Sequence, residues 1–217
     1  MSEDEAALLV DGVDNDLGWD ASQSGRRKKN NGPKVNFKKK KLALGKFEGF
    51  PELTKFLRKR FAEVEVLKDF ETIEECYLEY ELDRGAHIEP HIDDCWIWGE
   101  RIVTANCIGD SVLTLTKHVP LYPQQYNINL VDEYKNQLIS PLTDFIADDI
   151  AIRIPMPEKS LLVLYGSPRY QYEHSVLRED ITARRVAIAY REFTVPYLKN
   201  GQKYNEALEI FKLCELT

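Results

Sequence analysis

The segment Ile88-Glu89-Pro90-His91-Ile92-Asp93, taken with His174 eighty-one residues after Asp93, says most about the fold and the chemistry of this chain. Glu89 precedes a proline and is therefore biased toward extended backbone, so we expect a strand here. Side chains alternate along a strand, which places His91 and Asp93 on the same side. Two histidines and one carboxylate are the ligands of facial sites that bind non-haem Fe(II) and leave coordination positions open. The spacing predicts an Fe(II) site made of these three residues.

Each part of this pattern also has a simpler explanation. The chain contains four histidines and many aspartates, so a His-x-Asp triplet arises readily by chance. His91 would then be a partly exposed strand histidine, and Asp93 a turn residue. The surrounding sequence favours the metal site, because strand and turn signals fall on both sides of the ligands.

Extended segments surround the candidate ligands. Residues 74–82 alternate and are rich in Tyr and Leu, and the Asp83-Arg84-Gly85 that follows is turn sequence. Residues 160–166 are an apolar run that ends in a turn, and residues 174–177 form a short run that carries the second histidine. We predict a strand for each of these runs.

Residues 183–193 predict a further strand with an unusual face. Arg185 and Arg191 share that face with Ala187 and Ala189, while the residues of the other face are apolar. The small alanines leave a groove, and arginine presents a planar fork that fits a carboxylate. A dicarboxylate co-substrate needs such a pair beside the iron, so the pattern predicts an iron- and 2-oxoglutarate-dependent oxygenase. Two charges on a solvated strand face are the alternative.

Several longer segments carry a resemblance to a known family. Over roughly residues 19–195, their order is similar to that of the AlkB family of Fe(II)/2-oxoglutarate dioxygenases, and within it of the fourth animal subfamily. The segments are Ser22-Gln23-Ser24-Gly25-Arg26-Arg27, Gly32-Pro33-Lys34-Val35-Asn36-Phe37, His91-Ile92-Asp93-Asp94 with Trp96-Ile97-Trp98-Gly99-Glu100-Arg101, Ser160-Leu161-Leu162-Val163-Leu164, and Ala183-Arg184-Arg185-Val186 running to Arg191-Glu192.

The resemblance implies a fold and a set of cofactors. The family fold is a double-stranded β-helix, or jelly roll, so we expect an all-β core with flanking helices (α+β). Fe(II), 2-oxoglutarate and O2 are the expected cofactors. Carried over, His91, Asp93 and His174 match the catalytic iron ligands. Arg185 matches the arginine that pairs with the distal carboxylate of 2-oxoglutarate, and Arg191 the second arginine, near the other end of the co-substrate.

Two tyrosines are further cofactor-binding candidates. Tyr80 matches the family tyrosine that hydrogen-bonds 2-oxoglutarate. Tyr77 stands three residues earlier, where the subfamily usually has an asparagine, and its phenol can still donate a hydrogen bond. Asn31 replaces a usual tyrosine before Gly32-Pro33, which concerns substrate contacts. The cysteine-rich N-terminal segment of the subfamily is missing, so we expect a truncated form.

The family's reaction is the oxidative removal of N-methyl groups, with release of formaldehyde, succinate and CO2. Its substrates are nucleic-acid bases, and the subfamily is associated with N6-methyladenine in DNA and with methyl-lysine in actin. We expect a DNA N6-methyladenine demethylase that prefers single-stranded or distorted DNA, because the base must leave the stack. A demethylase of a methylated protein such as actin, regulating actomyosin, and a non-enzymatic binding module on a decayed oxygenase fold are the alternatives.

Basic residues concentrate in one short stretch. The net charge is -7, yet residues 26–41 carry nine Lys and Arg and no acid. Such a stretch predicts phosphate contact or a nuclear import signal, with a solvated basic face as the alternative. We expect the nucleus, and as a second location the cytoplasm. The predicted nucleic-acid contacts are Arg26, Arg27, Lys28, Lys29, Lys34, Lys38, Lys39, Lys40 and Lys41, with Trp96 and Trp98 stacking on a base or, alternatively, filling the core.

Length and composition agree with one soluble catalytic domain. A chain of 217 residues can bury a sizeable core, and 43% hydrophobic residues is ordinary for a globular protein. No apolar run is long enough to span a membrane, and the acidic start is unlike a secretory signal. The four cysteines lack zinc-type spacing and predict reduced thiols, not a disulfide framework.

The outer parts of the chain carry helical patterns. We expect a short helix at residues 3–10, a helix at residues 50–66 on the outside of the jelly roll, and an irregular insertion at residues 117–150. The chain divides into an acidic N-terminal segment at 1–18, the dioxygenase domain at 19–196, and a C-terminal closing helix at 197–217.

Overall fold

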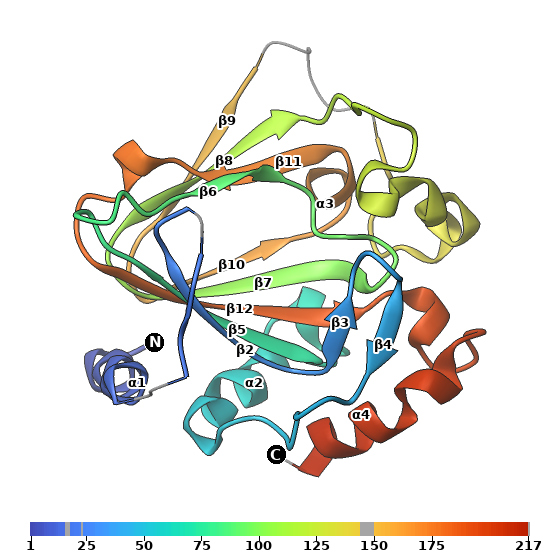
Figure 1. Ribbon diagram of the computed structural model, residues 1–217, viewed down its shortest axis with the longest axis horizontal. Coiled ribbons are helices and arrows are strands. Elements are labelled where there is room, and N and C mark those ends of the chain that lie inside the picture. Colours follow the sequence, from blue (N-terminus) through green and yellow to red (C-terminus); the bar gives the residue numbers. More distant parts are fainter. Residues whose placement is uncertain (16–17, 23, 144–149, 217) are drawn as a thin grey trace.

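The computed structural model describes residues 1–15, 18–22, 24–143 and 150–216. Two antiparallel sheets stack face to face and form a jelly roll (Figure 1), with strand orders β1-β2-β5-β12-β7-β10 and β6-β11-β8-β9. The all-β core expected from the sequence is thus confirmed. The strands of the large sheet are β1 (Asp20–Ala21), β2 (Arg27–Asn31), β5 (Glu74–Tyr80), β7 (Trp98–Ile108), β10 (Ser160–Leu164) and β12 (Arg185–Phe193); those of the small sheet are β6 (Ile88–His91), β8 (Ser111–Lys117), β9 (Ile152–Met156) and β11 (Tyr172–Val176).

Strand β12 shows why the large sheet is apolar on both faces. Val186, Ile188 and Tyr190 pack into a cluster on the outer face, whereas Ala189 belongs to the core between the sheets. This is the alternation predicted for residues 183–193. Two helices, α1 (Glu3–Asp14) and α2 (Lys55–Phe61), bury apolar side chains against the outer face. The large sheet therefore sits between helices on one side and the small sheet on the other.

The helices differ in length from the predictions. Helix α1 runs one turn beyond residue 10, because Val13 extends its buried stripe of Ala6 and Leu9. At the start of the helix, Ser2 closes a capping box with Glu5. Helix α2 is shorter than residues 50–66, since single 3₁₀ turns flank it on both sides. The hydroxyl of Thr54, just before the helix, donates to the buried Glu75 carboxylate of β5 at 2.9 Å, which fixes where the helix begins.

The remaining elements lie around the open ends of the jelly roll. Strands β3 (Lys34–Asn36) and β4 (Lys41–Ala43) form a hairpin beside the C-terminal helix α4 (Tyr204–Leu216) (Figure 1). The insertion after β8 contains the 3₁₀ segment η3 (Gln125–Glu133), as expected for an irregular connection; its residues 144–149 lie outside the described residues, as does Thr217. Among the described residues, no helix combines the length and apolar character that crossing a bilayer requires.

Candidate functional site

Two histidines face each other across neighbouring strands of the small sheet. His91 ends β6 and is the register partner of His174 in β11. Residues opposite one another in an antiparallel pair project from the same face. Leu115 of β8, the partner of His174 on its other side, belongs to the core, so this face is the inner one. The two imidazole ring centroids lie 4.2 Å apart.

Asp93 completes the expected cluster from a loop. Ligand atoms of His91, Asp93 and His174 all lie within 4.8 Å of one another. The prediction that His91 and Asp93 share a strand face is wrong, because β6 ends at His91. Asp93 Oδ2 is buried, lies 3.5 Å from His174 Nε2 and has no hydrogen-bond partner within the part of the chain that the structure describes. Such an oxygen is costly to bury unless a ligand binds it.

The protonation of the cluster suits a divalent cation. His91 Nδ1 lies 2.8 Å from the Glu89 carbonyl oxygen, which can only accept a hydrogen bond. Nδ1 therefore carries the proton, and Nε2 of His91 carries the lone pair that can bind a metal. Burial lowers the pKa of His174 to about 3, so this imidazole is neutral. Burial alone would raise the pKa of Asp93, but the positive charge of the Arg191 guanidinium outweighs it and lowers the pKa. Neutral imidazoles and an ionised carboxylate are the forms that bind metal.

Arg191 holds the carboxylate ligand in place. Its Nε donates to Asp93 Oδ1 at 2.7 Å, and its Nη1 donates to Glu74 Oε2 at 2.5 Å. The guanidinium also lies over the Trp98 ring, 5.6 Å from its centroid. Arg191 was predicted to lie near one end of the co-substrate, and its bond to Asp93 gives it a second role in orienting that carboxylate. The sequence reasoning missed Glu74, which no local signal distinguishes from other strand carboxylates.

Arg185 is a buried cation that lacks a carboxylate partner among the described residues. It is 1% exposed, and its Nε donates to Asn106 Oδ1 at 2.7 Å. Its guanidinium lies 4.8 Å from the ring centroid of Tyr80, its register partner on β5. The buried Tyr80 hydroxyl has no hydrogen-bond acceptor among the described residues, and burial raises its pKa, which keeps the proton available for donation. A buried cation and an orphaned donor are what an anionic ligand would satisfy.

Asn106 is a site residue that sequence reasoning missed. It lies on β7 opposite Ala187, and its Nδ2 donates to the carbonyls of Gly109, Met156 and Pro157. With Nδ2 fixed in this way, Oδ1 must face Arg185. The available signal was an amide side chain between the apolar residues Ala105 and Cys107.

Tyr77 was wrongly predicted to bind the co-substrate. Cys76, Leu78 and Tyr80 of β5 belong to the inner core, whereas Tyr77 packs in the outer cluster under the helices. Its hydroxyl lies 3.3 Å from Glu75 Oε2. The reason is the two-residue period of a strand, since positions three apart project from opposite faces.

Strand β2 divides the basic stretch between two faces. Arg27 is the register partner of Glu79 and donates to its carboxylate at 2.5 Å on the outer face, where Lys29 also projects as the partner of Tyr77. These two residues were predicted to contact nucleic acid beside the iron, and the alternation turns them away from it. Lys28 pairs with Leu78 and shares the inner face. Lys34 and the lysines of the hairpin turn, Lys38, Lys39, Lys40 and Lys41, are exposed.

The two tryptophans that were predicted to stack on a base are core residues. Trp96 and Trp98 are each 3% exposed, and they belong to the cluster between the sheets. Trp96 packs edge-on against Phe37 of the hairpin turn, and Trp98 lies beneath Arg191. Neither ring has a free face for a base, so the core alternative explains them.

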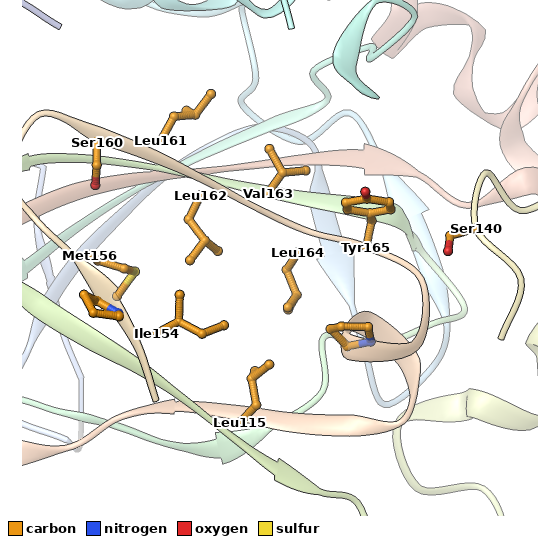
Figure 2. A pocket seen from close by; sticks show the side chains of 12 residues that line it. Leu115, Ser140, Ile154, Met156, Ser160, Leu161, Leu162, Val163, Leu164 and Tyr165 are labelled. Carbon is orange, nitrogen blue, oxygen red and sulfur yellow. The ribbon is translucent and has the colours of Figure 1, made fainter. Parts of the chain in front are cut away.

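Two cavities reach this region. A polar cleft of about 470 Å³ has His91 in its wall, together with Ser22, Ser24, Arg26, His87, Ile88 and Glu89. A second, mostly apolar cavity of about 550 Å³ lies where strands β9 and β10 separate (Figure 2). Leu162 and Leu164 point into it, whereas Leu161 and Val163 point the other way. Its wall includes Met156, whose sulfur lies 4.0 Å from Arg185 Nη2, so it approaches the buried arginine.

Comparison with known proteins decides the family. No protein-family model matches the chain. It is 36% identical over 219 residues to the human protein named alpha-ketoglutarate-dependent dioxygenase alkB homolog 4, covering 98% of this chain and 71% of that one. The chain belongs to the AlkB family of 2-oxoglutarate-dependent dioxygenases. The mouse protein of the same name is 35% identical, again over 98% of this chain and 71% of that one.

The AlkB assignment agrees with the fold and defines the cofactors. A DNA N6-methyl adenine demethylase of Caenorhabditis elegans is 34% identical over 208 residues, 95% of this chain and 62% of that one. A crystal structure of Pseudomonas putida prolyl-4-hydroxylase shares the fold, with a TM-score of 0.50, 12% identity, and coverage of 89% and 88% of the two chains. The protein is thus a dioxygenase that uses Fe(II), 2-oxoglutarate and O2, and the decayed, non-enzymatic alternative is set aside.

The contrast between the two tyrosines of β5 gives a test. Tyr80→Phe should raise the Km for 2-oxoglutarate by roughly 10- to 100-fold, because a hydrogen bond to a charged group contributes about 1.5–3 kcal/mol. Tyr77→Phe, its matched control on the outer face, should leave that Km unchanged. Succinate release at varied 2-oxoglutarate measures both; equal effects of the two variants would contradict the assignment.

Proposed function

We propose that this enzyme removes the methyl group of N6-methyladenine in DNA, with His91, Asp93 and His174 as ligands of one Fe(II). The carrying observation is that His91 of this cluster lies in the wall of the polar cleft that also contains Arg26. The hairpin of β3 and β4 adds exposed lysines to the same basic stretch. The C. elegans relative named for this activity supports the same substrate. A DNA substrate also agrees with the nuclear location expected from the basic stretch.

The chain's own residues do the positioning. Arg185 would bind the distal carboxylate of 2-oxoglutarate with help from Tyr80. The residues between Arg185 and Arg191 on the same face of β12 are the small Ala187 and Ala189. Arg191 keeps Asp93 ionised and oriented. When bound, iron, 2-oxoglutarate and O2 supply the oxidation that turns an N-methyl group into N-hydroxymethyl, which then releases formaldehyde. The inner faces of the sheets hold these reactants away from bulk water.

A methyl-lysine substrate is the second candidate, and Glu89 is the observation in its favour. This carboxylate is exposed, lies in the wall of the cleft and is two residues from His91. A cationic side chain would be attracted to it, while a phosphate would be repelled. Formaldehyde release from a methylated oligonucleotide and from a methyl-lysine peptide, measured side by side, separates the two. Glu89→Gln should lower turnover of the peptide and not of the DNA if methyl-lysine is the substrate.

The exposed lysines provide the test of DNA binding. Changing Lys38, Lys39, Lys40 and Lys41 to Glu should weaken binding of methylated single-stranded DNA steeply, because each neutralised phosphate releases counterions. The salt dependence, plotted as log K against log salt from about 50 to 200 mM, should lose roughly one unit of slope per lost contact. Uncoupled 2-oxoglutarate turnover should be spared.

The control is a variant in which two lysines away from the cleft are changed to glutamate. Lys55 and Lys59 lie on α2, which covers the outer face of the large sheet (Figure 1). Lys55→Glu with Lys59→Glu should leave DNA binding nearly as it was. If the hairpin variant instead binds methylated DNA like the parent, or if affinity ignores salt, the basic stretch is not the DNA contact and the methyl-lysine candidate leads.

A further inference from the structure

The segment η3 contacts the chain immediately next to two of the three iron-ligand candidates. The Cys95 N–H donates to the Tyr126 carbonyl at 2.9 Å, and Asn127 Nδ2 donates to Asp94 Oδ1 at 2.7 Å. Both bonds hold the loop that carries Asp93. On the other side, the Tyr126 hydroxyl lies 3.3 Å from Oε1 of Glu173, the neighbour of His174. One short segment thus bridges two ligand-bearing pieces of chain.

The backbone of η3 is held in an uncommon conformation at the same two residues. Tyr126 has φ 55° and Asn127 has φ 54°, both in the left-handed region. Asparagine tolerates this region, but a tyrosine there is rare. Such strain persists only where the surrounding structure fixes it, and it clusters at functional sites. Here the fixing contacts are the bonds to Asp94, Cys95 and Glu173.

Packing joins the insertion to the ligand loop as well. A separate buried cluster contains Ile92 and Cys95 of that loop, Val131 and Tyr134 of the insertion, and Tyr170 of α3 (Ser167–Tyr170). His118 Nδ1 lies 3.0 Å from the same Glu173 oxygen that Tyr126 approaches. Ile92 and Cys95, on either side of Asp93, therefore pack on the insertion, whereas Trp96 and Ile97 later in the same loop belong to the main core. The insertion thus acts together with Arg191 in placing Asp93.

We propose that Tyr126 and Asn127 are positioning residues, which set the distance between Asp93 and His174 and so the affinity of the metal site. The inference rests on the proposed iron site. Residues that orient ligands typically contribute about 10- to 100-fold to metal affinity. A segment that served only to stabilise the fold would change the unfolding temperature without changing how tightly the folded protein binds metal.

Asn127→Gly separates these two roles. Glycine adopts a positive φ without strain, so the backbone of η3 should be kept and the metal-free variant should remain folded, with an unfolding temperature somewhat below that of the parent. The amide that holds Asp94 is lost, so the Kd for Mn(II) should rise by about 10- to 100-fold. Free Mn(II), counted by its electron paramagnetic resonance signal, measures this without turnover. Tyr126→Phe, which keeps the ring and loses only the bond to Glu173, should raise the Kd a few-fold.

The control is Lys135→Gln in the same insertion, since this exposed lysine pairs with Asp132 and with none of the ligand-loop residues that the structure describes. It should bind Mn(II) like the parent. The rise in unfolding temperature on adding Mn(II) should shrink for Asn127→Gly and stay unchanged for the control. If both Asn127→Gly and Tyr126→Phe bind Mn(II) as tightly as the parent, the positioning role is overturned and the iron site stands. A parent protein that fails to bind Mn(II) overturns both.

Discussion

Asp93→Ala should abolish turnover while the jelly roll stays folded. The residue supplies the only carboxylate of the described metal cluster, and its unpartnered Oδ2 faces His174. With two imidazoles left, the site no longer has the ligand set of a facial iron centre. Succinate release should fall below detection, and bound Mn(II) should be lost. His91→Ala should behave in the same way.

A matched carboxylate far from the cluster makes this result specific. Asp83 lies in the exposed turn after β5, and Asp83→Ala should keep both metal and activity. Asp93→Ala frees Arg191 Nε but leaves its bond to Glu74, so the fold should lose stability without collapsing. Circular dichroism and the unfolding temperature check this point. Unchanged activity of the Asp93→Ala protein would rule the iron assignment out.

Arg185→Met should raise the requirement for 2-oxoglutarate by orders of magnitude. A charge-assisted bidentate pair to a carboxylate is among the stronger hydrogen-bonding arrangements, and its loss costs about 2–5 kcal/mol when it is buried. Titration of 2-oxoglutarate against succinate release measures the effect. A twofold change would point to Arg191 or a lysine as the main partner of the distal carboxylate.

The same variant should affect stability in the opposite direction. Arg185 is buried with no carboxylate partner among the described residues, and burial lowers its pKa. An apolar side chain of similar length removes that unpaired charge, so the co-substrate-free protein should unfold at an equal or higher temperature. The increase in unfolding temperature that 2-oxoglutarate gives the parent should disappear. A variant that simply unfolds would contradict this.

The local sequence predicted the strands and faces that build the site. Alternation placed Arg185 and Arg191 on the inner face of β12, and the same two-residue period accounts for the outward positions of Arg27 and Tyr77. Tyr77 was misassigned because the resemblance was followed where the period already excluded it. Arg27 was misassigned because the basic stretch was treated as one contact surface, without regard to the alternation along β2. Helix ends were predicted less well, since Thr54 and Val13 act through contacts with distant residues.

Contacts between distant segments decided the rest. Arg191 bonds to Asp93 and Glu74, Asn106 fixes Arg185, and Asn127 reaches Asp94, all between residues far apart in the chain. What the sequence alone determined is which residue types sit on which strand face, because backbone preference and side-chain alternation depend on near neighbours. Which partner a buried charge finds depends on the strands that pack opposite it, and only the tertiary structure decides that.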